Sequence, residues 1–155
     1  MNIWRCCLPL LLVTGCAAEI LQGETSARLE GARGMLGQMV VQNNAAGADR
    51  SVIHLSNTCN LKIGGASFAV ADLVEAVKAT PGRTVNSILV FSPSRALLQR
   101  IEYTTERPLS CAENRLYVAG DLRINGGTGG NELTFGPGAA QITQRHVDEV
   151  PGIMK

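Results

Sequence analysis

Alternation of apolar and polar residues along the chain predicts mainly β-strands, since a period of two is the pattern of a half-buried strand. The clearest case is residues 115–124, whose alternating apolar positions are Leu116, Val118, Leu122 and Ile124. The same alternation recurs over residues 97–104, while residues 84–91 end in four consecutive apolar residues. We therefore expect residues 84–91 to form a central strand buried on both faces, joined to the next strand by a hairpin turn at residues 92–95.

Shorter apolar segments on either side of this region predict further strands. Residues 52–55 and 61–63 are expected to form two separate strands, with a turn at residues 56–58 between them. After the Gly-rich loop that follows residue 124, the alternation resumes over residues 133–135 on a returning strand.

One segment has the periodicity of a helix instead. Four apolar residues stand at positions i, i+3, i+4 and i+7, namely Val70, Leu73, Val74 and Val77. Ser67 is a suitable N-cap, and Pro81 prevents the helix from continuing. We therefore predict an amphipathic helix over residues 67–80, with Asp72 and Glu75 solvated on its polar face.

Residues 17–50 allow two interpretations. Three apolar residues fall at helical spacing, namely Leu29, Leu36 and Val40. Against a helix, three glycines lie within residues 31–37, and each costs about 1 kcal/mol relative to alanine in a helix interior. The segment is either a marginal helix or a flexible tether that precedes a domain beginning near Ser51.

The N-terminal segment has the pattern of an export signal. One basic residue, Arg5, precedes a short apolar run over residues 6–13. This run is shorter than the roughly 20 residues that a membrane-spanning helix needs. It ends in Val13-Thr14-Gly15-Cys16, which resembles the lipobox of bacterial lipoproteins. The resemblance implies that residues 1–15 are removed and that Cys16 carries a lipid such as palmitate.

The residue after Cys16 indicates a destination. In the Gram-negative lipoproteins that the motif resembles, an alanine such as Ala17 is associated with sorting to the outer membrane, where the protein faces the periplasm. The alternative is an ordinary cleavage after Ala17 or Ala18, which releases a secreted soluble protein. The two outcomes differ in whether Cys16 is acylated.

The five cysteines are consistent with export. Cys6 and Cys7 lie in the removed segment and Cys16 carries the lipid, which leaves Cys59 and Cys111. An even pair in an exported protein predicts a disulfide, which would stabilise the fold by about 4 kcal/mol in the chain-entropy model. Free or metal-binding thiols in a cytosolic protein are the alternative, although no further Cys or His stands at ligand spacing.

The charge balance excludes one class of partner. The sequence has 14 basic and 13 acidic side chains, so removal of Arg5 with the signal leaves 13 of each. A balanced chain has no surplus of positive charge to neutralise a phosphate backbone, and we therefore expect no nucleic-acid partner. With 45% hydrophobic and 17% charged residues, the composition is that of a folded domain.

The sequence carries no recognised catalytic or metal-binding motif. Its two histidines, His54 and His146, stand in a predicted strand and in the C-terminal segment, with no sign that they converge. We therefore expect no metal, no cofactor and a non-catalytic role. The alternative is a periplasmic hydrolase that uses carboxylates such as Asp121 and Glu102 on neighbouring strands.

A binding role needs an exposed face. If a solvent-exposed sheet face binds a partner, we expect the main contacts to come from Tyr103, Tyr117 and Arg123, because aromatic and Arg side chains dominate interface hot spots. The acylated Cys16 provides the expected contact with membrane lipid, and an envelope protein is the candidate partner. The sequence does not indicate a small-molecule ligand.

These patterns predict an α+β fold of mainly antiparallel strands, a small sheet or sandwich with one helix and a disulfide. A short right-handed β-helix is the alternative, because residues 120–126 resemble one rung of the β-helices found in bactofilins. The expected organisation is a signal peptide at residues 1–15, a lipidated tether at 16–50, one β-rich domain at 51–143 and a flexible tail at 144–155. The expected function is a membrane-anchored envelope lipoprotein with a binding or scaffolding role.

Overall fold

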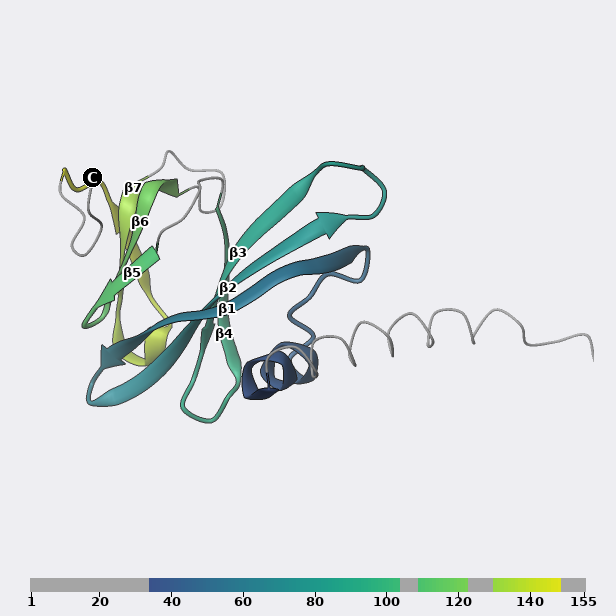
Figure 1. The fold of residues 1–155 in the computed structure, drawn as a ribbon. Coiled ribbons are helices and arrows are strands. Elements are labelled where there is room, and N and C mark those ends of the chain that lie inside the picture. The colour runs from purple at the N-terminus through teal and green to yellow at the C-terminus, as the bar shows by residue number, and fades with distance from the viewer. Residues whose placement is uncertain (1–33, 104–108, 123–129, 149–155) are drawn as a thin grey trace, which may run out of the picture.

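The computed structural model describes residues 34–103, 109–122 and 130–148. These ranges contain two four-stranded sheets, which we call the first sheet, ordered β1-β2-β3-β4, and the second sheet, ordered β5-β6-β7-β8 (Figure 1). The elements are β1 (Arg50–Ile63), β2 (Ala66–Val77), β3 (Thr84–Phe91), β4 (Leu97–Tyr103), β5 (Leu109–Ala112), β6 (Arg115–Leu122), β7 (Gly130–Phe135), the 3₁₀ turn η1 (Pro137–Ala139) and β8 (Ile142–Arg145).

The sheets confirm the predicted fold class. Each pairing between neighbouring strands of these two sheets is antiparallel. The β-helix alternative is therefore wrong for the described residues, because the rungs of a β-helix pair in parallel.

The helix predicted at residues 67–80 is wrong, because this segment is strand β2. Residues from Val70 to Leu73 are consecutive and at most 1% exposed, since one face of β2 packs toward the second sheet and the other toward a helix. In a strand buried on both faces, apolar and polar residues no longer alternate. The spacing of its apolar residues can then match that of a helix by chance. Three of the four matched residues are valine, whose branched side chain favours a strand.

Strand β1 is one 14-residue element, although two strands and a turn were expected in its place. Its register with β2 shifts between Val52 and His54 and again between Asn57 and Cys59, which marks two bulges. The turn predicted at residues 56–58 is therefore a bulge in a continuous strand. The polar residues 56–58 favour irregular backbone, and such backbone occurs both in turns and in β-bulges.

The other strand predictions are confirmed over the described residues, while the predicted strand positions 104, 123 and 124 lie outside them. Strand β3 has the expected bounds, and the turn at residues 92–95 joins it to β4. Strand β6 begins at Arg115, and its Leu116 and Val118 are fully buried. The short strand β5, which was not predicted, pairs with β6 across a two-residue turn.

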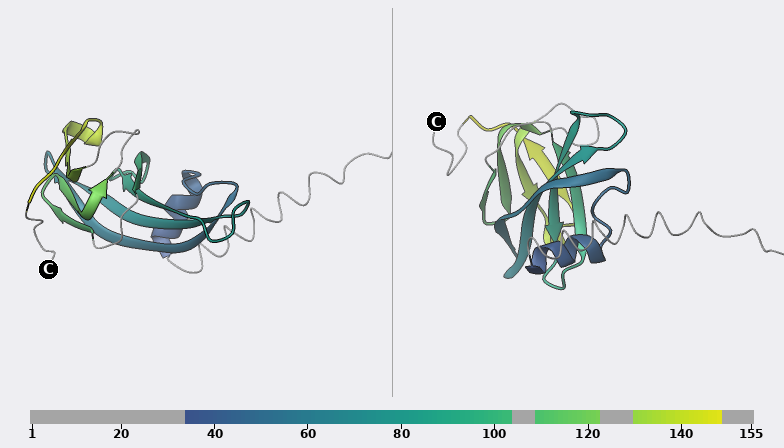
Figure 2. Two further views of the ribbon diagram at one scale, coloured as in Figure 1. Left: turned by 90° about the horizontal axis from the view of Figure 1, so that it is seen from above. Right: turned by 45° about the vertical axis from the view of Figure 1, so that its right-hand side comes forward.

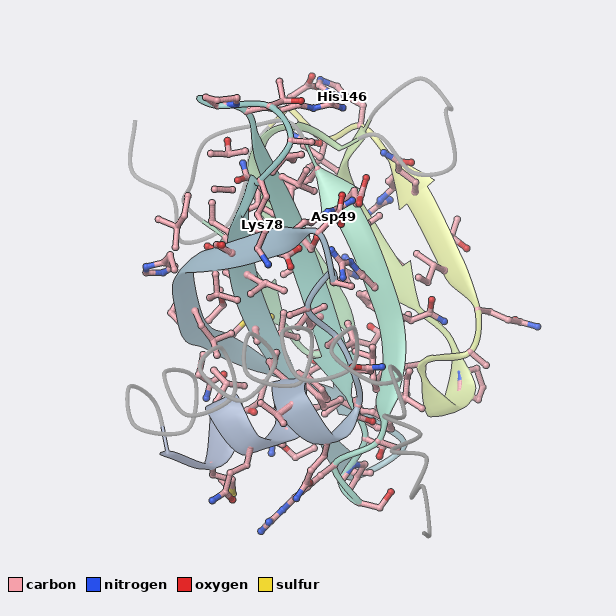
Figure 3. The ribbon with its side chains drawn as sticks, turned by 90° about the vertical axis from the view of Figure 1, so that its right-hand side faces the viewer. Asp49, Lys78 and His146 are labelled. Carbon is pink, nitrogen blue, oxygen red and sulfur yellow. A yellow bond between two sulfur atoms is a disulfide. The ribbon has the colours of Figure 1, made fainter. Side chains whose placement is uncertain are left out.

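The first sheet lies between two hydrophobic cores. Its inner face packs against the second sheet in a core that includes Leu61, Phe68, Val90, Leu116, Leu133 and Phe135. Its outer face packs against a helix in a core that includes Met39, Val40, Leu73, Leu89 and Phe91. Figure 1 shows this helix and the second sheet on opposite sides of the first sheet, and Figure 3 shows the molecule from the helix side.

The helix is formed by residues 34–42 and belongs to the folded unit. Met39 and Val40 are 5% and 0% exposed, and Ala45 in the following loop is 2% exposed. The folded unit therefore includes residues ahead of Ser51, and the tether interpretation does not hold for residues 34–50. Residues 1–33, with the lipobox and Cys16, lie outside the described residues.

A disulfide joins the edges of the two sheets. Cys59 in β1 and Cys111 in β5 form this bond with their Cα atoms 5.9 Å apart, as the sequence predicted. Close by, the Lys62 amide donates a hydrogen bond to the Glu113 carbonyl at 2.7 Å. Two edge strands from different sheets are thus held together at this side of the domain.

The described part of the predicted C-terminal tail is ordered by contacts with β7. Strand β8 extends to Arg145, two residues beyond the expected domain boundary at 143. The Asn131 side chain then binds both main-chain groups of Val147, donating to its carbonyl at 2.8 Å and accepting from its amide at 2.7 Å.

Candidate functional site

The inner face of the first sheet has an apolar half and a polar half. The second sheet packs on the apolar half, while β1 and β2 are long curved strands that extend beyond the second sheet (Figure 2). The registers place seven polar residues on the same face, namely Ser51, His54, Ser56, Asp72, Thr84, Asn86 and Tyr103. Val74 and Ala76 lie among them, and Tyr103 also packs in the core with the second sheet. We call these seven residues the polar half, and they come from all four strands of the sheet.

A buried hydrogen bond lies at the centre of the polar half. The Tyr103 hydroxyl on β4 donates to Asp72 Oδ1 on β2 at 2.7 Å, across the intervening strand β3. Asp72 is 1% exposed and Tyr103 is 3% exposed. A buried carboxylate is costly without partners, and a hydrogen bond to a charged group contributes about 1.5–3 kcal/mol. This contact therefore stabilises a carboxylate on a face that is otherwise suited to apolar packing.

Half-buried polar groups surround this bond. His54 Nε2 and Ser56 Oγ lie 2.9 Å apart on β1, and both side chains are half-buried. Asn86 on β3, also half-buried, is the register partner of Val74 and Tyr103. Imidazole, hydroxyl and amide groups each both donate and accept hydrogen bonds, so this part of the face can bind a polar ligand.

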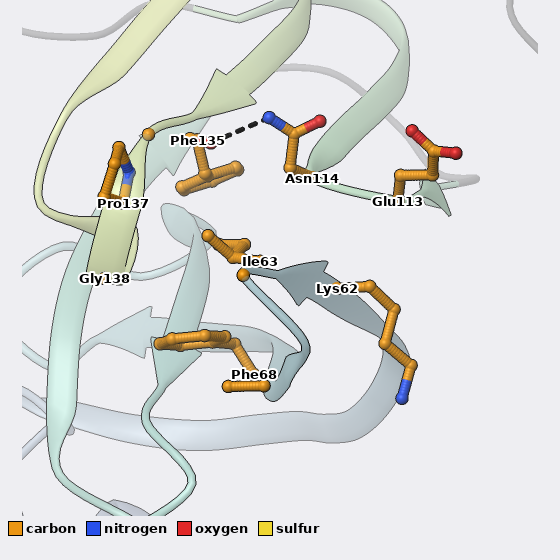
Figure 4. A pocket seen from close by; sticks show the side chains of 11 residues that line it. Lys62, Ile63, Phe68, Glu113, Asn114, Phe135, Pro137 and Gly138 are labelled. Atoms are coloured by element: carbon orange, nitrogen blue, oxygen red, sulfur yellow. Dashed lines mark hydrogen bonds between the residues drawn. The ribbon is translucent and has the colours of Figure 1, made fainter.

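An apolar pocket lies at the other end of β1. The turns between β1 and β2 and between β5 and β6 meet the segment after β7 around a cavity of about 780 Å³. Figure 4 shows Ile63, Phe68 and Phe135 around the opening, while the charged ends of Lys62 and Glu113 point away from it. The pocket therefore offers apolar contact without an acid or base directed at a ligand.

The backbone around this pocket is held firmly. The Phe135 amide donates to the Asn114 carbonyl at 2.9 Å, and Asn114 Nδ2 donates back to the Phe135 carbonyl at 2.9 Å. Glu113 beside Asn114 has a φ of 53°, in the left-handed region that costs an L-residue about 1 kcal/mol. This conformation belongs to the two-residue turn that joins β5 to β6.

A fully buried carboxylate fastens the helix segment to the outer face of the first sheet. Glu75 accepts hydrogen bonds from the Gly47 amide at 2.7 Å and from Arg100 Nη2 at 2.6 Å, and Arg50 Nη1 lies 3.4 Å away. Arg100 also donates to the Ala45 carbonyl. These bonds hold the loop after the helix against β2 and β4, and no group in them faces the pocket or the polar half.

The two carboxylates considered for a hydrolase do not lie on neighbouring strands. Glu102 is in β4 of the first sheet, whereas Asp121 is in β6 of the second sheet. The Glu102 side chain instead pairs with Arg50 at 3.2 Å. Although burial acts to lower the pKa of Arg50, Glu102 and Glu75 raise it above its ordinary value. Glu102 is therefore part of an ion pair on the outer face.

A second buried carboxylate lies in the second sheet. Glu132 is 1% exposed and accepts a hydrogen bond from Arg145 Nη2 at 3.0 Å. The Arg145 hydrogen bonds hold the pKa of Glu132 below its ordinary value of 4.5, against the effect of burial, and Tyr117 and Thr134 contribute to this lowering. Glu132 is therefore a charged structural group.

The predicted binding surface is wrong for two of its three residues. Tyr103 and Tyr117 are 3% and 4% exposed, and their hydroxyls form hydrogen bonds with the buried carboxylates of Asp72 and Glu132. Arg123 and Cys16 lie outside the described residues. Cys59 and Cys111 are bonded as predicted.

Sequence reasoning missed the polar half as a unit. His54 and Ser56 stand two apart, which places them on one face of a strand, and this signal was available. Asp72 was assigned to the solvated face of a helix that does not exist. The contact between Asp72 and Tyr103 joins residues 31 apart in the sequence, and it depends on the order of strands in the sheet.

Comparisons with protein families, with curated proteins and with solved structures give no match for this chain. Within residues 34–103, 109–122 and 130–148, no helix has the length and apolar character needed to cross a membrane. The same ranges contain no group of three or more His, Cys, Asp or Glu side chains placed to hold a metal ion.

Proposed function

We propose that the protein is a lipid-anchored lipoprotein of the bacterial envelope, held at the outer membrane and facing the periplasm, whose β domain binds another envelope protein without catalysis. The observation that carries the binding role is the apolar pocket formed by Ile63, Phe68 and Phe135. An apolar pocket with its charged rim directed outward suits the apolar side chain of a partner.

The anchoring role is supported by the sequence motif and by the cysteine pairing. The bond between Cys59 and Cys111 uses the pair that follows the signal. If residues 1–15 are removed, Cys16 is the one cysteine of the sequence outside this disulfide. It stands at the position where the lipobox resemblance places the lipid.

The anchor is tested by labelling cells that express the full chain with an alkyne analogue of palmitate. We expect the label on the wild-type protein and none on Cys16→Ser. Mass spectrometry of the mature N-terminus is the independent measurement. An unmodified N-terminus at Ala18 or Glu19 would show that the protein is secreted in soluble form.

The binding role is tested with a photo-crosslinking residue in place of the exposed Pro137 on the pocket. We expect one constant crosslinked partner in envelope fractions, which is lost when Ala66→Arg fills the pocket. Ala79→Arg is the matched control, because Ala79 is exposed in the turn after β2 and does not line the pocket. Equal crosslinking in both variants would exclude the pocket as the binding site.

A further inference from the structure

We propose that the disulfide between Cys59 and Cys111 assembles the apolar pocket, so that the pocket binds in the oxidised protein and loses affinity when the bond is reduced. This inference concerns the regulation of the pocket described above, and it rests on the function proposed for that pocket. It makes binding depend on the redox state of a single bond between the two sheets.

The pocket has two walls that belong to different sheets. The first wall is formed where β1 turns into β2, and it includes Ile63 and Phe68. The second wall is the turn between β5 and β6 together with the segment after β7, and it includes Asn114 and Phe135. Figure 4 shows the first pair on one side of the opening and the second pair on the other. The pocket therefore depends on how the two sheets are held at this end of the domain.

The disulfide connects the strands that lead into these two walls. Cys59 precedes Lys62 of the first wall by three residues, and Cys111 precedes Glu113 of the second wall by two. Between this bond and the pocket, the Lys62 amide donates a hydrogen bond to the Glu113 carbonyl at 2.7 Å. Because β1 and β5 belong to different sheets, these contacts and apolar packing set their separation, in place of the ladder that joins paired strands.

The second wall is held together by its own hydrogen bonds. The Phe135 amide donates to the Asn114 carbonyl at 2.9 Å, and Asn114 Nδ2 donates to the Phe135 carbonyl at 2.9 Å. Reduction of the disulfide leaves these bonds in place, since both residues belong to the second sheet. Strand β5 has four residues, three half-buried and one exposed, and an element with so little burial is easily released. The second wall can therefore move away from Ile63 and Phe68 once the covalent link is lost.

The disulfide is accessible to a dithiol reductant. Both cysteines are half-buried, so that neither is enclosed in the core. One thiolate of the dithiol attacks a cystine sulfur and expels the other sulfur as a thiolate, which leaves a mixed disulfide. The second thiolate of the dithiol then attacks this mixed disulfide and closes its own ring. Two electrons and two protons pass from the dithiol to Cys59 and Cys111, and both cysteines end as free thiols.

The test compares ligand binding by the oxidised and the reduced protein. It uses the full chain with the cysteines outside the disulfide replaced, by Cys6→Ser, Cys7→Ser and Cys16→Ser. The probe is indole, a neutral and mainly apolar molecule, titrated while the Ile63 methyl and Phe135 ring resonances are followed by NMR. We expect indole to shift these resonances in the oxidised protein. After treatment with dithiothreitol, indole should bind about tenfold more weakly, because the two walls no longer hold their spacing.

Amide hydrogen exchange measures the separation of the walls without any ligand. Reduction should speed exchange of the Lys62 amide by about tenfold, because its hydrogen bond to the Glu113 carbonyl crosses from one wall to the other. Exchange of the Phe135 amide should keep its rate, because its bond to Asn114 lies within the second wall. The two amides therefore form an internal comparison.

Two further proteins separate assembly of the pocket from general stability. The double variant Cys59→Ser and Cys111→Ser should bind indole as the reduced parent does and should not respond to dithiothreitol. Glu75→Gln weakens the attachment of the helix segment on the outer face and keeps the disulfide. It should bind indole as the oxidised parent does. Dispersed amide spectra show that each protein is folded.

Equal indole affinity before and after reduction, or unchanged exchange at Lys62, would overturn the proposal. Loss of the dispersed spectrum on reduction would also overturn it, since the bond would then hold the whole fold. Weak binding by Glu75→Gln would have the same consequence, because affinity would follow stability. If the oxidised parent binds no indole, the pocket fails together with its regulation. If indole binding depends on the disulfide but no partner is crosslinked at Pro137, only the partner protein of the proposed function fails.

Discussion

Gly130, at the start of β7, is a residue position without space for a side chain. A Cβ atom built there would overlap the carbonyl group of Arg145 on β8. Because that carbonyl is main chain, relief requires the two strands to move apart. The close approach of β7 to β8 therefore depends on a residue without a side chain.

We expect Gly130→Ala to lower the free energy of unfolding by about 2 kcal/mol, because overpacking at main chain costs about 1–3 kcal/mol. Urea denaturation provides the measurement. Thr143→Ala, at an exposed position on β8, should change it by no more than about 0.5 kcal/mol. If both variants matched the wild type, β7 and β8 would not approach as closely as described.

Glu132 gives stability a pH dependence of known sign. Its pKa in the folded protein lies below its ordinary value of 4.5, chiefly because Arg145 donates hydrogen bonds to it. A carboxyl with a lowered folded pKa contributes its full stability above the unfolded value. That contribution is lost progressively as the pH falls below about 4.5 and through the folded pKa.

The free energy of unfolding should therefore fall more steeply with acid in the wild type than in Glu132→Gln. The comparison is made by denaturant unfolding at several pH values between neutral and about 3. The variant should be less stable at neutral pH and should converge on the wild type in acid. Parallel curves for the two proteins would contradict the role assigned to Arg145.

At the scale of elements, the helix at residues 34–42 is held to the sheet by apolar packing and by Glu75. The Gly47 amide and Arg100 bind the same carboxylate, so a single side chain connects the loop after the helix to β2 and β4. Removing its charge leaves a partly buried guanidinium without its counter-ion.

Glu75→Gln is therefore expected to lower the free energy of unfolding by about 3 kcal/mol and to speed amide hydrogen exchange in residues 34–42. Glu102→Gln is the matched control, because its side chain is 58% exposed and pairs with Arg50 at the surface. An exposed pair contributes at most about 1 kcal/mol. Equal losses in the two variants would show that Glu75 does not hold the loop after the helix against the sheet.

Strands were predicted correctly where one face is exposed to solvent, or where the length of the apolar segment distinguishes a strand from a helix. Residues 84–91 and the alternation from residue 115 correctly predicted β3 and β6. The failure at β2 has a physical cause, since burial of both faces from Val70 to Leu73 removes the alternation. The helix at residues 34–42 was left open because its glycines oppose it, and tertiary packing of Met39 and Val40 outweighs that cost.

At the scale of the whole molecule, the disulfide joins the two sheets and closes a loop between residues 52 apart. Its reduction enlarges the conformational freedom of the unfolded chain, and we expect a loss of about 4 kcal/mol in unfolding free energy. The measurement compares denaturant unfolding with and without a thiol reductant. The double variant Cys59→Ser and Cys111→Ser should match the reduced wild type and should not respond to reductant.

The disulfide could be predicted because the cysteine count and the pattern of an export signal can be read from the sequence alone. The two candidate sites could not, because each depends on residues brought together by the arrangement of the sheets. Phe68 and Phe135 come from different sheets, and Asp72 and Tyr103 are separated by a strand. Strand order is set by packing over the whole domain, which local patterns do not specify.

The two bulges in β1 affect how copies of the protein behave beside one another. An edge strand presents unpaired main-chain groups to which the strand of another molecule can add. Molecules anchored in one membrane are concentrated in a plane and share an orientation, which promotes such contacts. The register shifts after Val52 and after Asn57 interrupt the even spacing of these groups along β1. The bulged edge therefore disfavours intermolecular sheet growth and fibril formation, a protection that matters most for a protein anchored as proposed above.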